Sequence, residues 1–169
     1  AYWQITPPGR NVPTKLGEIK VGFENDSEYL GSVTKIFNRA VMAVPGEVAQ
    51  VEDIETFRYI TLLFLLRTGS LAFISVWSPT FLSLLLQPAG QWADKLLQDI
   101  ETGRLTPPAG IDIKLKGVLE EYLRPDPARA GLLRPMLAAA DINFSEVWPG
   151  LKRGSCWGDG NSAAYVGEV

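Results

Sequence analysis

The stretch LAFISVWSP, residues 71–79, indicates that the chain is built around one central strand. Residues Leu71 to Trp77 are nearly all apolar, so we expect a strand covered on both faces, as in the middle of a parallel sheet. Ser78 and Pro79 then offer an N-cap and a proline at the first helical position. The stretch therefore predicts a strand that ends in a turn and opens directly into a helix.

Helical patterns flank this strand on both sides. Before it, Asp53 can cap a helix that runs to about Arg67, and the second half of that helix, ITLLFLL, is apolar nearly all round. Such a helix is expected to be buried between neighbours rather than to lie on a surface. After the strand, Pro88 interrupts a helix at residues 87–90, and the helical pattern resumes as far as Gly103.

Weaker patterns suggest further elements. Strands are expected at residues 2–5, 18–23 and 151–157, and helices at residues 26–44, 113–123 and 126–140. The charged residues of the helix that ends at Gly103 are expected on its solvated face; they are Asp94, Lys95, Asp99 and Glu101.

The order of these elements predicts an α/β fold. Helices separate the strands at 71–77 and 151–157, so the two strands are expected to pair in parallel through a right-handed crossover. The expected architecture is a layered sheet with a parallel strand pair flanked by helices, in a single domain over residues 1–169.

Composition excludes several classes of function. The chain has 169 residues, a formal net charge of −3, no histidine and one cysteine, Cys156. Zinc sites built from Cys and His are therefore excluded, as are Ser-His-Asp and Cys-His catalysis. No basic stripe suits nucleic acid, and no apolar run approaches the ~20 residues of a membrane helix. A single cysteine excludes an internal disulfide and favours a reducing, cytoplasmic location.

Two junctions between a strand and a helix carry the candidate ligand-binding residues. They are Val76-Trp77-Ser78-Pro79 and Trp157-Gly158-Asp159-Gly160-Asn161. Ligands of open α/β sheets bind at the carboxyl ends of strands, so two neighbouring junctions would line one crevice. Structural roles stay open, because a Trp after a strand can cover the core, a lone Gly-x-Gly is a weak nucleotide signal, and Asp159 can cap its own turn.

Arg58 lies inside an otherwise apolar helix. Its guanidinium needs a carboxylate or phosphate partner, or its side chain has to extend to solvent.

A family resemblance rests on two runs, SVWSPTFLSLLLQPAGQWADKLLQDIETGRL at residues 75–105 and VWPGLKRGSCWGDGNSAAYV at residues 147–166. They resemble bacterial members of the auxin-responsive acyl-acid-amido synthetase (Gretchen Hagen) family of the adenylate-forming superfamily. The shared features are the strand–Ser–helix junction, a W-P-x-x-K turn before a strand, and a helix end formed by Trp92, Leu96, Asp99, Ile100, Gly103 and Leu105. The likeness spans nearly the whole chain.

The resemblance implies a two-step reaction. A carboxylic acid attacks the α-phosphate of ATP, with magnesium offsetting phosphate charge, and an amino acid then displaces AMP to form an amide. It implies that the acyl acid is bound by Val76, Trp77, Ser78 and Phe81, with Arg58 and Tyr59 on a substrate-facing helix. It places the adenine end of the nucleotide near Gly158, Asp159, Gly160 and Asn161. A Trp at position 77 would make the acid pocket small.

The family's phosphate loop and its Tyr-x-Ser-Ser-Glu-like motif are not found in this sequence. We therefore expect the chain to be an internal part of an adenylate-forming N-terminal domain, inactive on its own, and we assign it no catalytic or metal-binding residue. One alternative is a stand-alone α/β binding module, because aromatic anchors dominate interfaces and an exposed apolar face would promote self-association. Another is a nucleotide-binding or methyltransferase-like domain.

Overall fold

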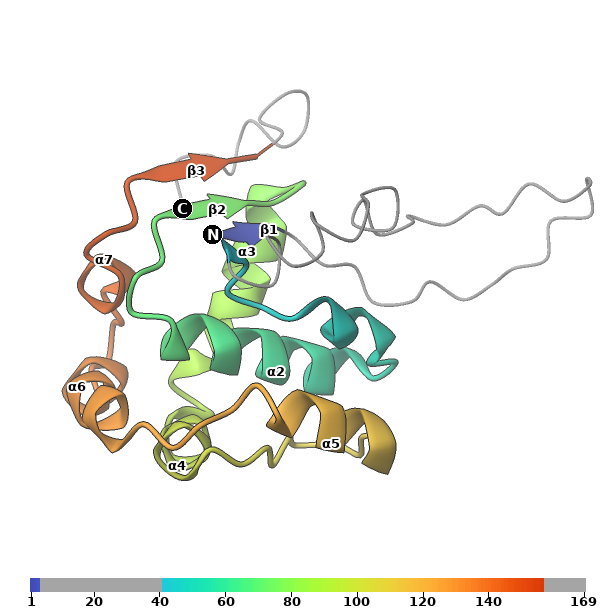
Figure 1. Ribbon diagram of the computed structural model, residues 1–169. Coiled ribbons are helices and arrows are strands. Elements are labelled where there is room, and N and C mark those ends of the chain that lie inside the picture. Colours follow the sequence, from blue (N-terminus) through green and yellow to red (C-terminus); the bar gives the residue numbers. More distant parts are fainter. Residues whose placement is uncertain (4–40, 157–169) are drawn as a thin grey trace, which may run out of the picture.

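The computed structural model describes residues 1–3 and 41–156 and shows a small parallel sheet beside layers of helices (Figure 1). The strands pair in parallel in the order β1-β2-β3. They are β1 (Tyr2–Trp3), β2 (Phe73–Ser75) and β3 (Arg153–Ser155). The predicted parallel pair is confirmed, and the strand predicted at residues 2–5 is found as β1 in the part of it that the structure describes. The strand predicted at residues 18–23 and most of the helix predicted at 26–44 lie outside the described residues.

The segments between the strands are helical. They are η2 (Gly46–Gln50), α2 (Ile54–Arg67), α3 (Pro79–Leu86), η3 (Gln87–Ala89), α4 (Ala93–Thr102), α5 (Ile113–Glu120), α6 (Pro127–Leu137) and α7 (Phe144–Val147), where η denotes a 3-10 helix. The predicted break at 87–90 is confirmed, since α3 gives way to η3 before α4 begins. The sequence did not indicate η2 or α7, because segments of five and four residues are too short for a periodic pattern.

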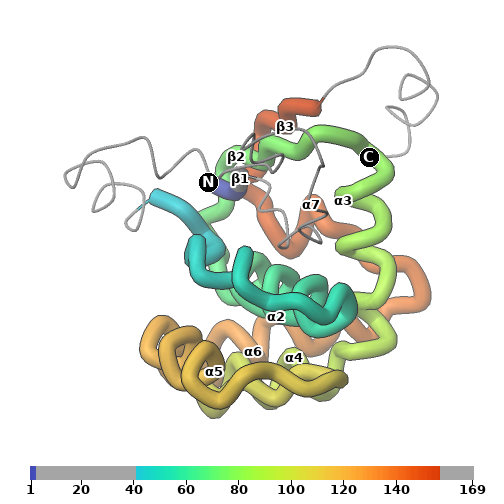
Figure 2. Tube along the Cα trace, turned by 90° about the vertical axis from the view of Figure 1, so that its right-hand side faces the viewer, coloured from blue at the N-terminus to red at the C-terminus, as the bar shows by residue number. Residues whose placement is uncertain are grey.

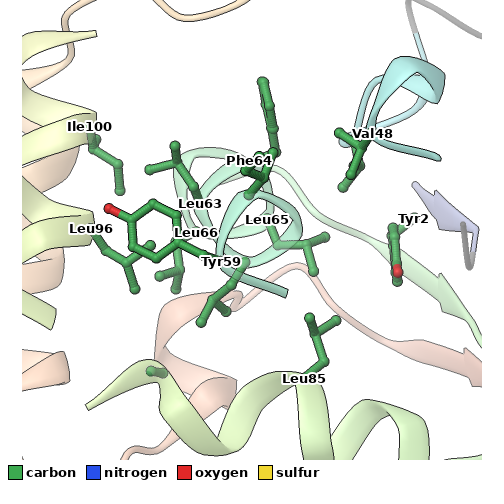
Figure 3. Packing of buried hydrophobic residues seen from close by; sticks show 14 of the residues in the cluster. Tyr2, Val48, Tyr59, Leu63, Phe64, Leu65, Leu66, Leu85, Leu96 and Ile100 are labelled. Atoms are coloured by element: carbon green, nitrogen blue, oxygen red, sulfur yellow. The ribbon is translucent and has the colours of Figure 1, made fainter. Parts of the chain in front are cut away.

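Helix α2 forms the middle layer of the molecule. Figures 1 and 2 show it between the sheet on one side and α4, α5 and α6 on the other. Asp53 caps its start by accepting a hydrogen bond from the Thr56 amide at 2.7 Å. In Figure 3 Tyr59 points toward α4, while Val48, Tyr2 and Leu85 surround other sides of the helix. The prediction of a helix buried between neighbours is confirmed.

Side chains from later in the chain hold the end of α2. The last carbonyls of a helix have no partner within it. Here the Trp148 indole Nε1 donates to the Leu65 carbonyl at 3.0 Å, and Arg129 Nε donates to the Leu66 carbonyl at 2.8 Å. Arg129 Nη2 also donates to the Val147 carbonyl at 3.0 Å. These contacts join the end of α2 to α6 and to the end of α7.

A buried carboxylate joins α2 to α4. The Tyr59 hydroxyl donates to Asp99 Oδ2 at 2.8 Å, and Thr106 donates to the same carboxylate through its amide at 2.7 Å and its hydroxyl at 2.8 Å. Asp99 is 1% exposed, so the expectation that it lies on a solvated face is wrong, because that side of α4 is turned toward α2. Burial, reinforced by the Asp99 charge, raises the pKa of Tyr59 above its ordinary value.

Gly103 ends α4 in a left-handed conformation with φ of 68°. Its amide donates to the Asp99 carbonyl at 2.9 Å, which closes the last turn of the helix. A Cβ at this position would lie 2.7 Å from the backbone nitrogen of Pro125. Glycine is therefore required at this position for two reasons: the left-handed backbone conformation, and the close approach of the segment that leads into α6.

The central strand is fully covered on one face only. Ile74 and Val76 are buried, whereas Phe73 and Ser75 are half-buried and Trp77 is exposed. The expectation of cover on both faces is therefore wrong for the described residues, because the helices pack against the side that carries Ile74 and Val76. The opposite face leads to Trp77 at the carboxyl end of the strand.

We expect Trp148→Phe to lower the free energy of unfolding by about 2 kcal/mol. The substitution removes the indole donor to the Leu65 carbonyl and leaves a void in the core. The matched control is Trp77→Phe, at a side chain that is 51% exposed, which should change stability by less than about 0.5 kcal/mol. Urea denaturation followed by far-UV circular dichroism measures both, and equal losses would contradict the role given to Trp148.

We expect Tyr59→Phe to cost about 1–2 kcal/mol at neutral pH, because a buried hydrogen bond to a carboxylate is lost. The pKa of Tyr59 is raised on folding, so its contribution is complete below the unfolded value of about 10 and is lost as the pH rises above it. The native protein should therefore lose stability above about pH 10 more steeply than Tyr59→Phe.

Thr106→Val supplies the contrast for this measurement. It removes only the hydroxyl bond to Asp99 Oδ1 and leaves Tyr59 in place. This variant should be less stable at neutral pH and should retain the alkaline slope of the native protein. A Tyr59→Phe variant with an unchanged alkaline slope would show that another group is responsible for it.

Candidate functional site

The carboxyl ends of β2 and β3 lie side by side. Ser75 pairs with Ser155 in the parallel register, and the Val76 amide donates to the Ser155 carbonyl at 2.8 Å. Backbone hydrogen bonding between the two strands thus extends to Val76, the residue after β2, and Cys156 directly follows β3. The predicted meeting of two strand ends at one edge of the sheet is confirmed as far as Cys156. The turn predicted beyond it, Gly158 to Asn161, lies outside the described residues.

The four residues predicted after β2 differ in exposure. Val76 is 5% exposed and belongs to the core, while Trp77 is 51% exposed at the strand end. Ser78 and Phe81 are half-buried. Ser78 occupies the N-cap position before Pro79, as predicted, but its hydroxyl does not accept the capping hydrogen bond of α3. The end of β2 therefore presents an indole, a hydroxyl and a phenyl ring close together in the sequence.

Cys156 carries an exposed free thiol just after β3. All three residues of β3 are exposed, so the described residues leave this strand open on both faces. Trp77, which follows β2, and Cys156, which follows β3, are thus the exposed side chains at these two strand ends.

Arg58 and Tyr59 occupy different environments although they are adjacent. Tyr59 is fully buried and donates to Asp99, so its hydroxyl is committed to the contact between α2 and α4. Burial raises the pKa of Tyr59, so its hydroxyl stays a donor to Asp99 further into the alkaline range than an exposed tyrosine would. Arg58 is half-buried and lines a surface pocket with Leu84 of α3 and Gln87 of η3. Sequence reasoning missed this pocket, which forms only where the break at Pro88 turns the chain toward α2.

The described residues hold no group of three or more His, Cys, Asp or Glu side chains placed to bind a metal ion. Within the same part of the chain, no helix is both long and apolar enough to cross a membrane. The exposed large apolar side chains of the described residues come from separate elements; they are Val41, Ile54, Trp77, Leu84, Ile113, Val118 and Leu132.

Comparison with solved structures shows the fold. The chain is similar to GH3.15 acyl acid amido synthetase, with a TM-score of 0.67 and 19% identity over 76% of this chain and 24% of that one. It is also similar to AtGH3.15 acyl acid amido synthetase in complex with 2,4-DB, with a TM-score of 0.61 and 21% identity over 69% and 21% of the two chains. This chain thus spans under a quarter of the length of either structure.

Sequence comparison shows the family. No curated protein sequence matches the chain. Residues 10–169, however, match the GH3 family N-terminal domain, which confirms at the level of the family the resemblance seen at residues 75–105 and 147–166. The chain therefore belongs to the GH3 family and corresponds to part of its N-terminal domain.

Proposed function

We propose that this chain forms one wall of the active site of an ATP-dependent acyl acid amido synthetase. Such an enzyme activates a carboxylic acid as an acyl-adenylate and then joins the acyl group to an amino acid. The observation that carries the proposal is the adjacency of the strand ends at Val76 and Cys156 in a chain of the GH3 family. Ligands of open α/β sheets bind at such an edge.

Three side chains after β2 would contact the carboxylic acid. The exposed ring of Trp77 offers a flat apolar wall, and Phe81 lies one turn into α3. The Ser78 hydroxyl, which does not cap the helix, is available to hydrogen-bond a polar group of the acid. Val76 supports these residues from the core below. The bulk of Trp77 would narrow the pocket and favour small or flat acids.

The neighbouring strand would lead toward the nucleotide. In this proposal Gly158, Asp159, Gly160 and Asn161 approach the adenine of ATP. Magnesium, bound with ATP, supplies charge neutralisation for the phosphates. No residue of the described part is proposed to hold that ion, because no cluster of acidic side chains lies at the strand ends.

The chain alone is not expected to catalyse the reaction. Val76, Trp77, Ser78 and Phe81 carry no charge, and a transition state with a developing phosphate charge needs preorganised cations or dipoles around it. The solved GH3.15 structures that resemble this chain are about three times as long, because the match covers 76% of this chain but 24% of one structure, and 69% but 21% of the other. The chain would thus contribute the shape of the acid pocket, and other parts of a GH3 enzyme would contribute the phosphate chemistry.

Carboxylate-dependent exchange of pyrophosphate into ATP tests the proposal. We expect no exchange with the 169-residue chain, and exchange when the same sequence is placed within a complete GH3 protein. Robust exchange by the chain alone would contradict the assignment of the phosphate chemistry to other parts of a GH3 enzyme. Absence of exchange in both, with a panel of acids, would instead favour a non-enzymatic binding module.

Trp77→Ala in the complete protein tests the acid pocket. Removing the ring should raise KM for small acids about tenfold or more and leave KM for ATP unchanged, because a buried aromatic contact is worth about 1–2 kcal/mol. The control is Ile113→Ala, at a side chain that is 82% exposed on α5. Equal effects of the two substitutions on KM for the acid would exclude Trp77 from the pocket.

A further inference from the structure

Strand β3 has no buried side chain to fix its position. All three of its residues are exposed, as are Lys152 before it and Cys156 after it. A buried face is what normally fixes the register of a strand. Here β3 is tied to the fold by its backbone pairing with β2 and by the segment that leads into it from α7. The contacts of that segment therefore have a large influence on where β3 ends.

The segment before β3 is held against the end of α2. Arg129, on α6, joins the two, since its Nε donates to the Leu66 carbonyl at 2.8 Å and its Nη2 donates to the Val147 carbonyl at 3.0 Å. The Trp148 indole donates to the Leu65 carbonyl at 3.0 Å on the same helix end. One planar guanidinium, with its N–H donors in a fixed geometry, thus spans two backbone segments that are distant in the sequence.

The same helix end also leads into β2. Helix α2 ends at Arg67, and β2 begins at Phe73 after a short loop. The turn before β3 approaches this loop closely, because a Cβ added at Gly150 would lie 3.5 Å from the Leu71 carbonyl oxygen. Both strands therefore start beside one shared point of attachment. A change at this point moves the end of β3 relative to the end of β2.

We propose that Arg129 is a positioning residue for the nucleotide side of the candidate site. It acts through β3, because holding the Val147 carbonyl against α2 determines where the strand ends beside Val76. The proposal rests on the proposed function, which assigns the end of β2 to the carboxylic acid and the end of β3 to ATP. Catalysis is sensitive to such placement, since a shift of about 1 Å between reacting groups can cost a factor of about 100 in rate.

Arg67 offers a matched control. It is half-buried like Arg129, and burial lowers the pKa of both guanidinium groups. It also donates to two backbone carbonyls, those of Tyr122 at 2.8 Å and Arg124 at 3.4 Å. These carbonyls precede α6, and neither belongs to the segment that leads into β3. Arg67→Met and Arg129→Met should therefore both lower stability, whereas only Arg129→Met should loosen β3.

Amide hydrogen exchange of the 169-residue chain, followed by NMR, tests the positioning without an assumption about function. The Val76 amide, which donates to Ser155, should exchange about tenfold or more faster in Arg129→Met, relative to the Ile100 amide inside α4. Arg67→Met should leave this ratio unchanged. Arg129→Lys, whose ammonium can still donate to a carbonyl, should recover part of the loss. If a methionine variant does not fold, Arg129→Lys and Arg67→Lys provide the same comparison.

Kinetics of a complete GH3 protein test the assignment to the nucleotide. In the pyrophosphate exchange assay, Arg129→Met should raise KM for ATP about fivefold or more and keep KM for the carboxylic acid within about twofold of the native value. Arg67→Met should leave both unchanged. A purely structural role would lower the amount of active protein and leave the ratio of the two KM values as it is.

Two results would overturn the proposal. One is an equal effect of Arg129→Met and Arg67→Met on the exchange of the Val76 amide. The other is an unchanged KM for ATP in an active Arg129→Met protein. Absence of pyrophosphate exchange in the native complete protein would contradict the proposed function instead, and the amide exchange of the chain would still decide whether Arg129 positions β3.

Discussion

The structure depends on the burial of α2, whose residues from Thr56 to Leu66 are all buried apart from the half-buried Arg58. The polar groups of this buried part need partners within the protein, since an unpaired buried donor or acceptor is costly. The Tyr59 hydroxyl, the Leu65 carbonyl and the Leu66 carbonyl find partners in Asp99, Trp148 and Arg129. These partners lie on or beside α4, α7 and α6, so one apolar helix determines where three others pack. The same helix leads through a short loop into β2 and thereby places the strand end that carries Trp77.

Local patterns in the sequence were sufficient for the elements around α2 but not for their contacts. The Asp53 cap, the break at Pro88 and the stop at Gly103 are local signals, and each is found where it was predicted. The burial of Asp99 was not predictable in this way, because its partner Tyr59 is 40 positions distant. The apolar run at 71–77 also predicted a longer strand than the structure has. Leu71 and Val76 are apolar because they are buried in the core, but they lie outside β2.

The residues of the helix-end motif between Trp92 and Leu105, on which the family resemblance rests, stabilise the fold rather than line the candidate site. Asp99 is the buried acceptor between α2 and α4, Ile100 and Leu105 are fully buried, and Gly103 admits the backbone of Pro125. These roles explain why such a pattern indicates a fold more strongly than it indicates a substrate. At the candidate site, only the adjacency of two strand ends followed from the order of the elements. The pocket at Arg58 forms between α2 and the segment around Pro88, which are distant in the sequence, so no local pattern predicts it.

The hydrogen bonds at the end of α2 also govern the order of events during biosynthesis. Leu65 leaves the ribosome 83 residues before Trp148, the donor to its carbonyl. At a translation rate of about 5–20 residues per second, the ITLLFLL segment waits roughly 4 to 17 s for that partner. Over this interval an apolar helix with an open end is exposed to solvent or to a chaperone. Completion of the core is thus a late, long-range event, and slowing elongation between α2 and α7 would prolong the aggregation-prone stage of the nascent chain.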